Sequence, residues 1–154
     1  EPQELMTRPY PAGGSIHELE FYLAIERCDG LEPGFYHYDG HRHGLRLLRH
    51  GDEAASPFVT RSASAMGLAD RRPQMVVLIS TRLPRLAWKY EGMAYRASLL
   101  NVGVVFQTMY LVATDMGLAC CANGTGSIAD FAEKTGLDVF EETAIGEVAI
   151  GVRE

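Results

Sequence analysis

The chain has 154 residues, a length that fits one domain with its own hydrophobic core. Hydrophobic residues make up 47% of it and charged residues 22%, as is ordinary for a globular protein. The formal net charge of −6 argues against a nucleic-acid partner, because binding to a phosphate backbone requires a basic surface.

The N-terminal part begins in a loop. Residues 8–15, RPYPAGGS, hold two prolines and two glycines within six positions, which excludes a regular helix or strand. Such loops let backbone amides approach a ligand closely, although an ordinary turn explains the composition as well. No helix or strand pattern precedes Pro11, and the start is unlike a signal peptide. We therefore expect the later part of a longer, cytoplasmic protein.

A strand and a hairpin follow. Apolar and polar residues alternate over residues 19–26, which predicts a half-buried strand. Residues 35–39 and 45–48 are predicted strands joined by a Gly- and His-rich turn. Two histidines of this turn, His41 and His43, have no cysteine or carboxylate at ligand spacing, so we interpret them as solvated residues rather than a metal site.

Two further elements lead to the centre of the chain. Ser56 and Pro57 resemble an N-cap and a first helical residue, which predicts a helix ending near Gly67. Residues 75–81 form a continuous apolar run, typical of a central strand buried on both faces. Residues 83–90 are ambiguous, and a short helix after Pro84 is one interpretation.

A long apolar helix, about seven turns, dominates the second half and ends at Gly117. Its apolar residues extend well beyond one face, so we expect it to be buried nearly all round. A second subunit could bury the remaining apolar surface of this helix, and the strands of the same chain are the alternative. Asn101, Gln107 and Asp115 interrupt the run, so we expect no membrane span.

The C-terminal elements are short. Residues 118–122 fit a buried strand, residues 123–126 (NGTG) a turn, and residues 145–152 a final strand. Between them Ser127 is expected to cap a helix that ends at Gly136. The three cysteines are expected to be free thiols. Together the elements predict one domain, residues 1–154, of α+β or α/β class around one dominant helix, and the α+β class is the one we adopt.

Chemistry is most plausible at the ends of this helix. Lys89 and Tyr90 are adjacent ionisable residues in aromatic surroundings, and each can move a proton if its pKa is drawn toward neutrality. A plain surface pair is the competing interpretation. Arg96 could bind an anion, or could form a salt bridge with Glu91. The NGTG turn lacks the spacing of known phosphate-binding motifs, so the residues alone do not define a reaction.

The chain resembles the SagB-type dehydrogenases, FMN-dependent oxidases of nitroreductase-like fold. The resemblance covers residues 8–151 and rests on the PAGG loop, the YHYD strand, the Lys-Tyr pair and the NVG helix, which recur together at the family's spacing. It implies two-electron oxidation of a peptide-borne thiazoline or oxazoline to the azole in natural-product biosynthesis, with FMN reduced and then reoxidised by O₂. It also implies a mixed sheet around the long helix.

Residue by residue, the resemblance assigns roles to three segments. Lys89 and Tyr90 match the family's catalytic pair, one as the base and the other orienting or stabilising charge. The loop that contacts the isoalloxazine ring is matched by Pro11, Ala12, Gly13, Gly14 and Ser15. The segment that approaches the flavin from the other side of the helix is matched by Asn123, Gly124 and Thr125.

The resemblance also implies binding partners, and the sequence departs from the family's pattern in one respect. It implies a homodimer with FMN at the interface, a modified peptide as substrate, and a cyclodehydratase or carrier protein as a further partner. The N-terminal helix with an Arg-rich segment that grips the FMN phosphate is missing from this chain, and Arg96 and Arg153 are candidate substitutes. Two alternatives remain: an NAD(P)H-dependent nitro or quinone reductase, and a non-catalytic scaffold subunit of a peptide-modifying complex.

Overall fold

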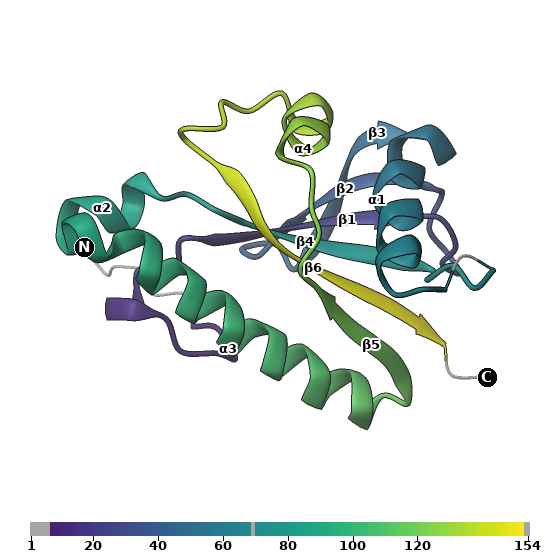
Figure 1. The fold of residues 1–154 in the computed structure, drawn as a ribbon, viewed down its shortest axis with the longest axis horizontal. Helices are drawn as coiled ribbons and strands as arrows, with labels where there is room; N and C mark the ends of the chain where they lie inside the picture. The colour runs from purple at the N-terminus through teal and green to yellow at the C-terminus, as the bar shows by residue number, and fades with distance from the viewer. Residues whose placement is uncertain (1–6, 69, 153–154) are drawn as a thin grey trace.

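The computed structural model describes residues 7–68 and 70–152. Its centre is a six-stranded sheet of order β3-β2-β1-β4-β6-β5 (Figure 1). The strands are β1 (Leu19–Ile25), β2 (Gly34–Asp39), β3 (Gly44–His50), β4 (Met75–Thr81), β5 (Leu118–Asn123) and β6 (Thr143–Val152). The helices are α1 (Asp52–Ala65), α2 (Pro84–Tyr90), α3 (Ala94–Asp115) and α4 (Ile128–Thr135), with short 3₁₀ turns η1 (Gly13–Ser15) and η2 (Glu91–Met93).

The α+β class is confirmed, but the sheet is not mixed. Every neighbouring pair of strands in the described ranges runs antiparallel. Short turns join β1 to β2 and β2 to β3, and a short connection can only return the chain in the opposite direction. The mixed sheet expected from the resemblance is therefore wrong for this part of the chain.

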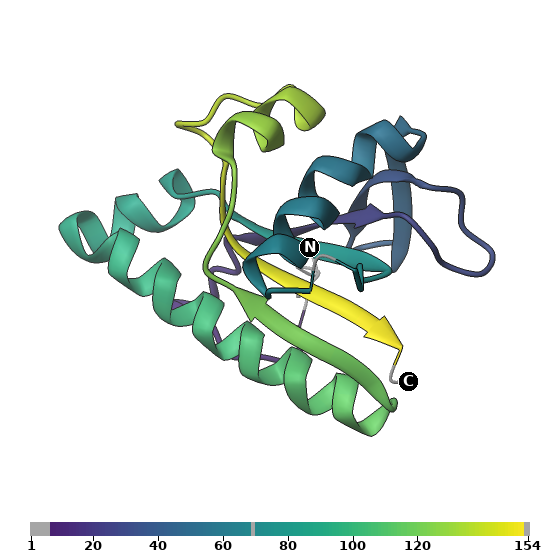
Figure 2. The same cartoon turned by 45° about the vertical axis from the view of Figure 1, so that its right-hand side comes forward.

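The helices cover both faces of the sheet. α1 and α4 lie on one face and α3 runs along the other, as Figures 1 and 2 show from two directions. Along β4, Val76 and Leu78 join the core beneath α1, whereas Val77 and Ile79 join the core beneath α3. This alternation buries β4 on both faces, as its continuous apolar sequence predicted.

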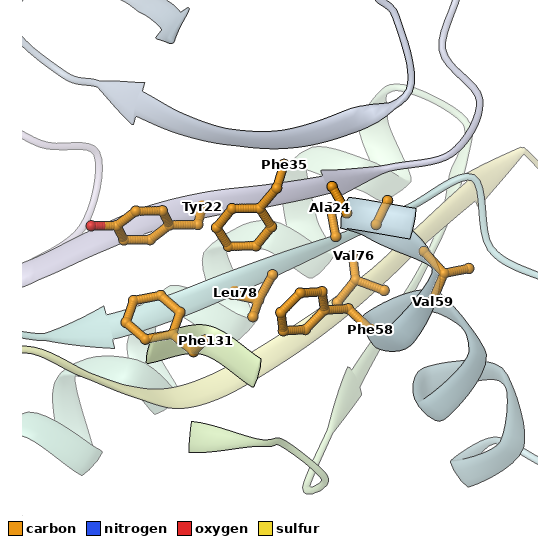
Figure 3. Packing of buried hydrophobic residues seen from close by; sticks show 10 residues of the cluster. Tyr22, Ala24, Phe35, Phe58, Val59, Val76, Leu78 and Phe131 are labelled. Atoms are coloured by element: carbon orange, nitrogen blue, oxygen red, sulfur yellow. The ribbon is translucent and has the colours of Figure 1, made fainter. Parts of the chain in front are cut away.

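Aromatic rings build much of the core beneath α1. Phe58 of α1 stacks on Phe35 of β2 with ring centroids 5.2 Å apart. Phe131 of α4 meets Tyr22 of β1 edge-on at 5.0 Å (Figure 3). All four residues are buried. This packing fixes α4 on the sheet, and with it the loop that precedes α4.

Helix α1 starts earlier than predicted. Ser56 and Pro57 were expected at its N-terminus, but the helix begins at Asp52. The acidic residues of this first turn suit the helix dipole. Ala54 and Ala55 are buried against the sheet. Pro57 therefore lies inside the helix. Because proline has no backbone N–H, the helix lacks one hydrogen bond there, and burial of the preceding turn against the sheet offsets this loss.

Helix α3 is covered on one side only. Its buried residues are Ala94, Ser98, Asn101, Val102, Val105 and Ala113. Large apolar side chains elsewhere on it are 42% to 63% exposed, namely Leu99, Leu100, Leu111 and Val112. The expected burial nearly all round is therefore wrong for a single chain, because the sheet contacts one face of the helix.

The helical segment Pro84–Asp115 is long and apolar enough, by length and composition, to cross a membrane, because an 18-residue window within it has a mean hydropathy of 1.4. This differs from the expectation based on its interrupting polar residues. Val102 and Val105 of the segment pack against the sheet, and Asn101 forms hydrogen bonds with two residues that precede β1, Gly13 and Glu18. These contacts favour a core helix of the domain.

The other predicted boundaries agree closely with the structure. The ambiguous residues 83–90 contain the short helix α2. In α4 the Ser127 hydroxyl accepts the N–H of Asp130 at 3.1 Å, and Gly136 ends the helix with a φ of 74°. Both caps are confirmed. Strand β5 lies at the edge of the sheet, so it is only partly buried.

Candidate functional site

The Gly-rich loop and the Lys-Tyr pair lie against each other. A Cβ atom on Gly14 would lie 2.7 Å from Lys89 Nζ and 2.8 Å from the Tyr90 hydroxyl oxygen. Gly14 also has a φ of 59°, which side chains disfavour. The backbone conformation favours glycine at this position, and a side chain here would also displace the ends of Lys89 and Tyr90. Two segments that the sequence analysis treated separately form one site.

The end of α2 presents the pair. Lys89 lies in the last turn, where the helix dipole favours a cation, and its Nζ is 5.6 Å from the centre of the Tyr90 ring. Lys89 is exposed and Tyr90 is half-buried. Glu91 adopts a φ of 46°, so the chain turns sharply between α2 and α3. The turn ends α2 immediately after these two side chains.

A buried ionic network holds the chain just before α2. Arg82 donates from Nε to the Glu142 carboxylate at 2.7 Å and approaches Glu20 at 3.1 Å. Glu142 also accepts hydrogen bonds from the hydroxyls of Ser80 at 2.6 Å and Tyr22 at 2.8 Å. The network joins β1, β4 and the loop before β6, and so fixes the direction in which the chain leaves β4.

Two pKa values in this network move in opposite directions. Burial opposes ionisation of Glu142, but hydrogen bonds from Ser80, Arg82 and Tyr22 outweigh it, so the pKa of this carboxyl lies below its usual value. Burial raises the pKa of Tyr22 far above its usual value, and the Glu142 charge adds to the effect. Glu142 is therefore a charged acceptor and Tyr22 a neutral donor.

Helix α3 reaches the Gly-rich loop through Asn101. Its Oδ1 accepts the N–H of Gly13 at 3.2 Å, and its Nδ2 donates to the Glu18 carboxylate at 2.8 Å. The sequence analysis identified Asn101 as an interruption of an apolar run and as part of the NVG motif, but assigned it no role. A polar residue on the buried stripe of a helix was the available signal, but its partners could not be identified from the sequence.

The second predicted loop lies on the opposite face of the sheet. Asn123 is buried, and its Nδ2 donates to the hydroxyl of Ser62 on α1. Gly124 and Thr125 are exposed. Thr125 borders a cavity of about 810 Å³ on the outer side of α1, lined by Glu53, Ser56, Pro57, Thr60, Arg61, Ser64, Ala65 and Thr125. Within one chain, residues 123–125 and residues 11–15 thus do not share a site.

A charged cluster lies beneath this second loop. Arg61 pairs with Asp130 at 2.7 Å and approaches the buried Glu147 at 3.9 Å. Burial raises the pKa of Glu147 to about 7, against the attraction of Arg61. The hydrogen bond from Arg61 holds the pKa of Asp130 below its usual value. Among the described residues, Nε and Nη2 of Arg61 have no hydrogen-bond partner.

Of the two arginines considered for phosphate binding, the structure describes only one. Arg96 is exposed on the first turn of α3, close in sequence to the Lys-Tyr pair. Arg153 lies outside the described residues.

Comparison with known proteins identifies the family. The nitroreductase family matches residues 5–152. The protein MJ1384 of Methanocaldococcus jannaschii, named as a nitroreductase, is 30% identical over 122 residues, covering 79% of this chain and 57% of that protein. The microcin B17-processing protein McbC of Escherichia coli is 27% identical over 123 residues, covering 72% of this chain and 42% of that protein.

A solved structure shows the same fold. A chain in the E. coli microcin synthetase McbBCD complex with truncated pro-MccB17 bound matches with a TM-score of 0.76 at 20% identity, covering 97% of this chain and 57% of that chain. The chain thus spans about half the length of the relatives it matches. The resemblance to SagB-type proteins is confirmed at the level of family and fold. Because the family match extends over nearly all of its residues, the chain belongs to the nitroreductase family, whose members are generally flavin-dependent oxidoreductases.

Proposed function

We propose that this protein is an FMN-dependent oxidoreductase that converts a thiazoline or oxazoline of a modified peptide into the azole. The observation that carries the proposal is the close approach of Gly14 to Lys89 Nζ and the Tyr90 hydroxyl. The Gly-rich loop presents its backbone amides without large side chains, and two groups able to move a proton lie directly beside it. Similarity to McbC, named as a microcin-processing protein, supports a peptide substrate.

The residues present fit a flavin in two half-sites. The first is the Gly-rich loop with Lys89 and Tyr90. The second is the exposed Gly124–Thr125 backbone beside the pocket that Arg61 helps to line, where a guanidinium suits an anionic or carbonyl group. FMN, when bound, supplies the two-electron acceptor. Because the half-sites lie on opposite faces of one chain, a homodimer is the arrangement in which each would complete the other.

The chain's own residues would manage the proton. Aromatising an azoline ring removes one hydride and one proton from adjacent ring atoms, so a base must stand beside the ring. Lys89 and Tyr90 are the candidates: one takes the proton and the other orients it or stabilises the charge. Placement at the end of a short, pinned helix keeps both groups directed at the same place.

Replacing Lys89 by alanine tests this function. We expect Lys89→Ala to abolish azole formation from a synthetic thiazoline peptide while FMN stays bound, because the base or its partner is lost and the cofactor loops are intact. Peptide mass, which falls by two hydrogens on oxidation, is the measurement. Lys134→Ala, which removes the other lysine of the chain, on α4, is the control. Turnover unchanged in Lys89→Ala would contradict the proposed role.

A second candidate is a nitro or quinone reductase driven by NAD(P)H, which the 30% identity to MJ1384 favours. It predicts NAD(P)H-dependent loss of a nitroarene that does not require Lys89.

Flavin absorbance decides between the two enzyme functions on one side and a scaffold subunit on the other. Protein that remains colourless after mixing with FMN would contradict both enzyme proposals and favour a non-catalytic partner of a cyclodehydratase or carrier protein in the cytoplasm.

A further inference from the structure

The proposed reaction leaves the buried polar residues of α3 without a role. Ser98 and Asn101 lie three residues apart, on the same side of the helix, among otherwise apolar buried residues. Buried polar groups destabilise a fold unless they are hydrogen-bonded. Both have partners: Gly13 lies in the Gly-rich loop, Glu18 follows that loop, and Thr81 ends the strand that leads into α2.

Asn101 bridges the two ends of a strained loop. Gly14, Ser15 and His17 have φ values of 59°, 55° and 52°. Non-glycine residues hold such values only where their surroundings fix them. Asn101 binds the N–H of Gly13 on one side of this run at 3.2 Å and the carboxylate of Glu18 on the other at 2.8 Å.

The chemistry of these contacts requires a carboxamide. Gly13 presents a donor, and Glu18 presents a carboxylate that is fully buried. A carboxamide offers one acceptor and one donor from a single short side chain. Aspartate has the same shape but would direct an acceptor at the Glu18 carboxylate. Leucine has a similar size but would leave both groups buried without this partner.

The same helix face also fixes the chain that leads into α2. The Ser98 hydroxyl donates to the Thr81 hydroxyl at 2.8 Å. The backbone carbonyl of Glu18 accepts the N–H of Arg82 at 3.0 Å. Glu18 is therefore held by Asn101 through its side chain and holds Arg82 through its backbone. The Gly-rich loop and the entry to α2 share one anchor.

We propose that Asn101 is a positioning residue that sets the Gly13–Gly14 backbone against Lys89 and Tyr90 by spanning the strained loop from Gly13 to Glu18. The part of this proposal that concerns catalysis depends on the proposed function. The part that concerns loop geometry stands on the hydrogen bonds alone.

Amide exchange of the cofactor-free protein tests the geometry. We expect Asn101→Asp to speed hydrogen exchange of the Gly13 amide by about tenfold or more, because its acceptor is drawn away with the repelled side chain. The double variant Asn101→Asp with Glu18→Gln restores one donor facing one acceptor and should return exchange toward the wild-type rate. Glu133→Gln, an exposed one-charge change on α4, is the control.

Kinetics of the FMN-loaded protein on a synthetic thiazoline peptide test the consequence. We expect kcat of Asn101→Asp to fall by about tenfold or more with KM nearly unchanged, and the double variant to recover it, because misplaced groups lose rate before they lose binding. A merely structural residue would lower the amount of folded protein and leave kcat per bound flavin unaltered.

The outcomes are separable. If the wild-type protein oxidises no azoline, the proposed function fails, yet Gly13 exchange still decides the geometry. If Asn101→Asp does not fold, Asn101→Ala, which removes both bonds without adding charge, replaces it in both measurements. Unchanged Gly13 exchange in the folded single variant overturns the proposal. A folded double variant that exchanges as fast as Asn101→Asp would also overturn it.

Discussion

Glu147 shows how one buried side chain can make stability depend on pH. It is 1% exposed, and burial raises the pKa of its carboxyl to about 7 from 4.5. The folded protein therefore binds this proton more tightly than the unfolded chain. Stability from this group is complete below pH 4.5 and is lost as pH rises to about 7. A shift of this size corresponds to roughly 3 kcal/mol.

Replacing Glu147 by glutamine should remove this pH dependence. We expect Glu147→Gln to be more stable than the wild type at about pH 8 and to differ little from it at about pH 5, because the buried charge is absent at high pH only in the variant. Urea unfolding at both pH values is the measurement, with Glu133→Gln as control. Parallel pH profiles for Glu147→Gln and the wild type would show that Glu147 is not responsible.

The site residues differ in how far the sequence could reveal them. Lys89, Tyr90 and Gly14 were identified by residue type and resemblance, but their contact was not, because a sequence does not show which segments approach one another. Asn101 and Glu142 were missed as functional candidates. Each looks ordinary in its own segment, and its importance comes from hydrogen bonds to residues distant in the chain.

At the scale of elements, the cap of α4 controls the loop proposed to face the flavin. Ser127→Ala removes the acceptor of the Asp130 N–H and should lower the free energy of unfolding by about 1 kcal/mol. Urea unfolding is the measurement. Ser64→Ala, an exposed serine within α1, should change stability much less. Equal effects of the two substitutions would argue that the Ser127 hydroxyl is not acting as a cap.

Elements with local signals were predicted well, and those decided by packing were not. Ser127 and Gly136 act through neighbouring residues, so α4 was predicted with both ends correct. The start of α1 was misplaced, because Pro57 gives a strong local signal while the burial of Ala54 and Ala55 depends on the sheet. The hairpin β2–β3 was found from its turn, but antiparallel pairing across β4 was not specified by any single segment.

At the scale of the whole molecule, α3 leaves an apolar surface that one chain does not cover. Leu100 and Leu111 are 61% and 63% exposed and lie eleven residues apart, which places them on one side of the helix about three turns apart. Gly103, also exposed, lies between them and allows close approach of another backbone. We propose that this surface contacts a second copy, which would unite the two proposed half-sites.

Charging this surface should separate the copies and disable the cofactor site together. We expect the double substitution Leu100→Glu and Leu111→Glu to yield a folded monomer, because two carboxylates per chain cannot be buried unpaired at a symmetric contact. Light scattering after size exclusion gives the mass, and flavin absorbance gives FMN content. Phe140→Glu, which changes an 85% exposed apolar residue outside α3, should leave both unchanged.

The two measurements together identify which half of the dimer proposal holds. Loss of FMN along with the dimer would support half-sites completed across the interface, since neither substituted leucine belongs to a predicted cofactor loop. A monomeric variant that still binds FMN would place the whole cofactor site within one chain. A variant that remains dimeric would show that the copies associate through another surface, and α3 would then need a different partner for its exposed apolar side.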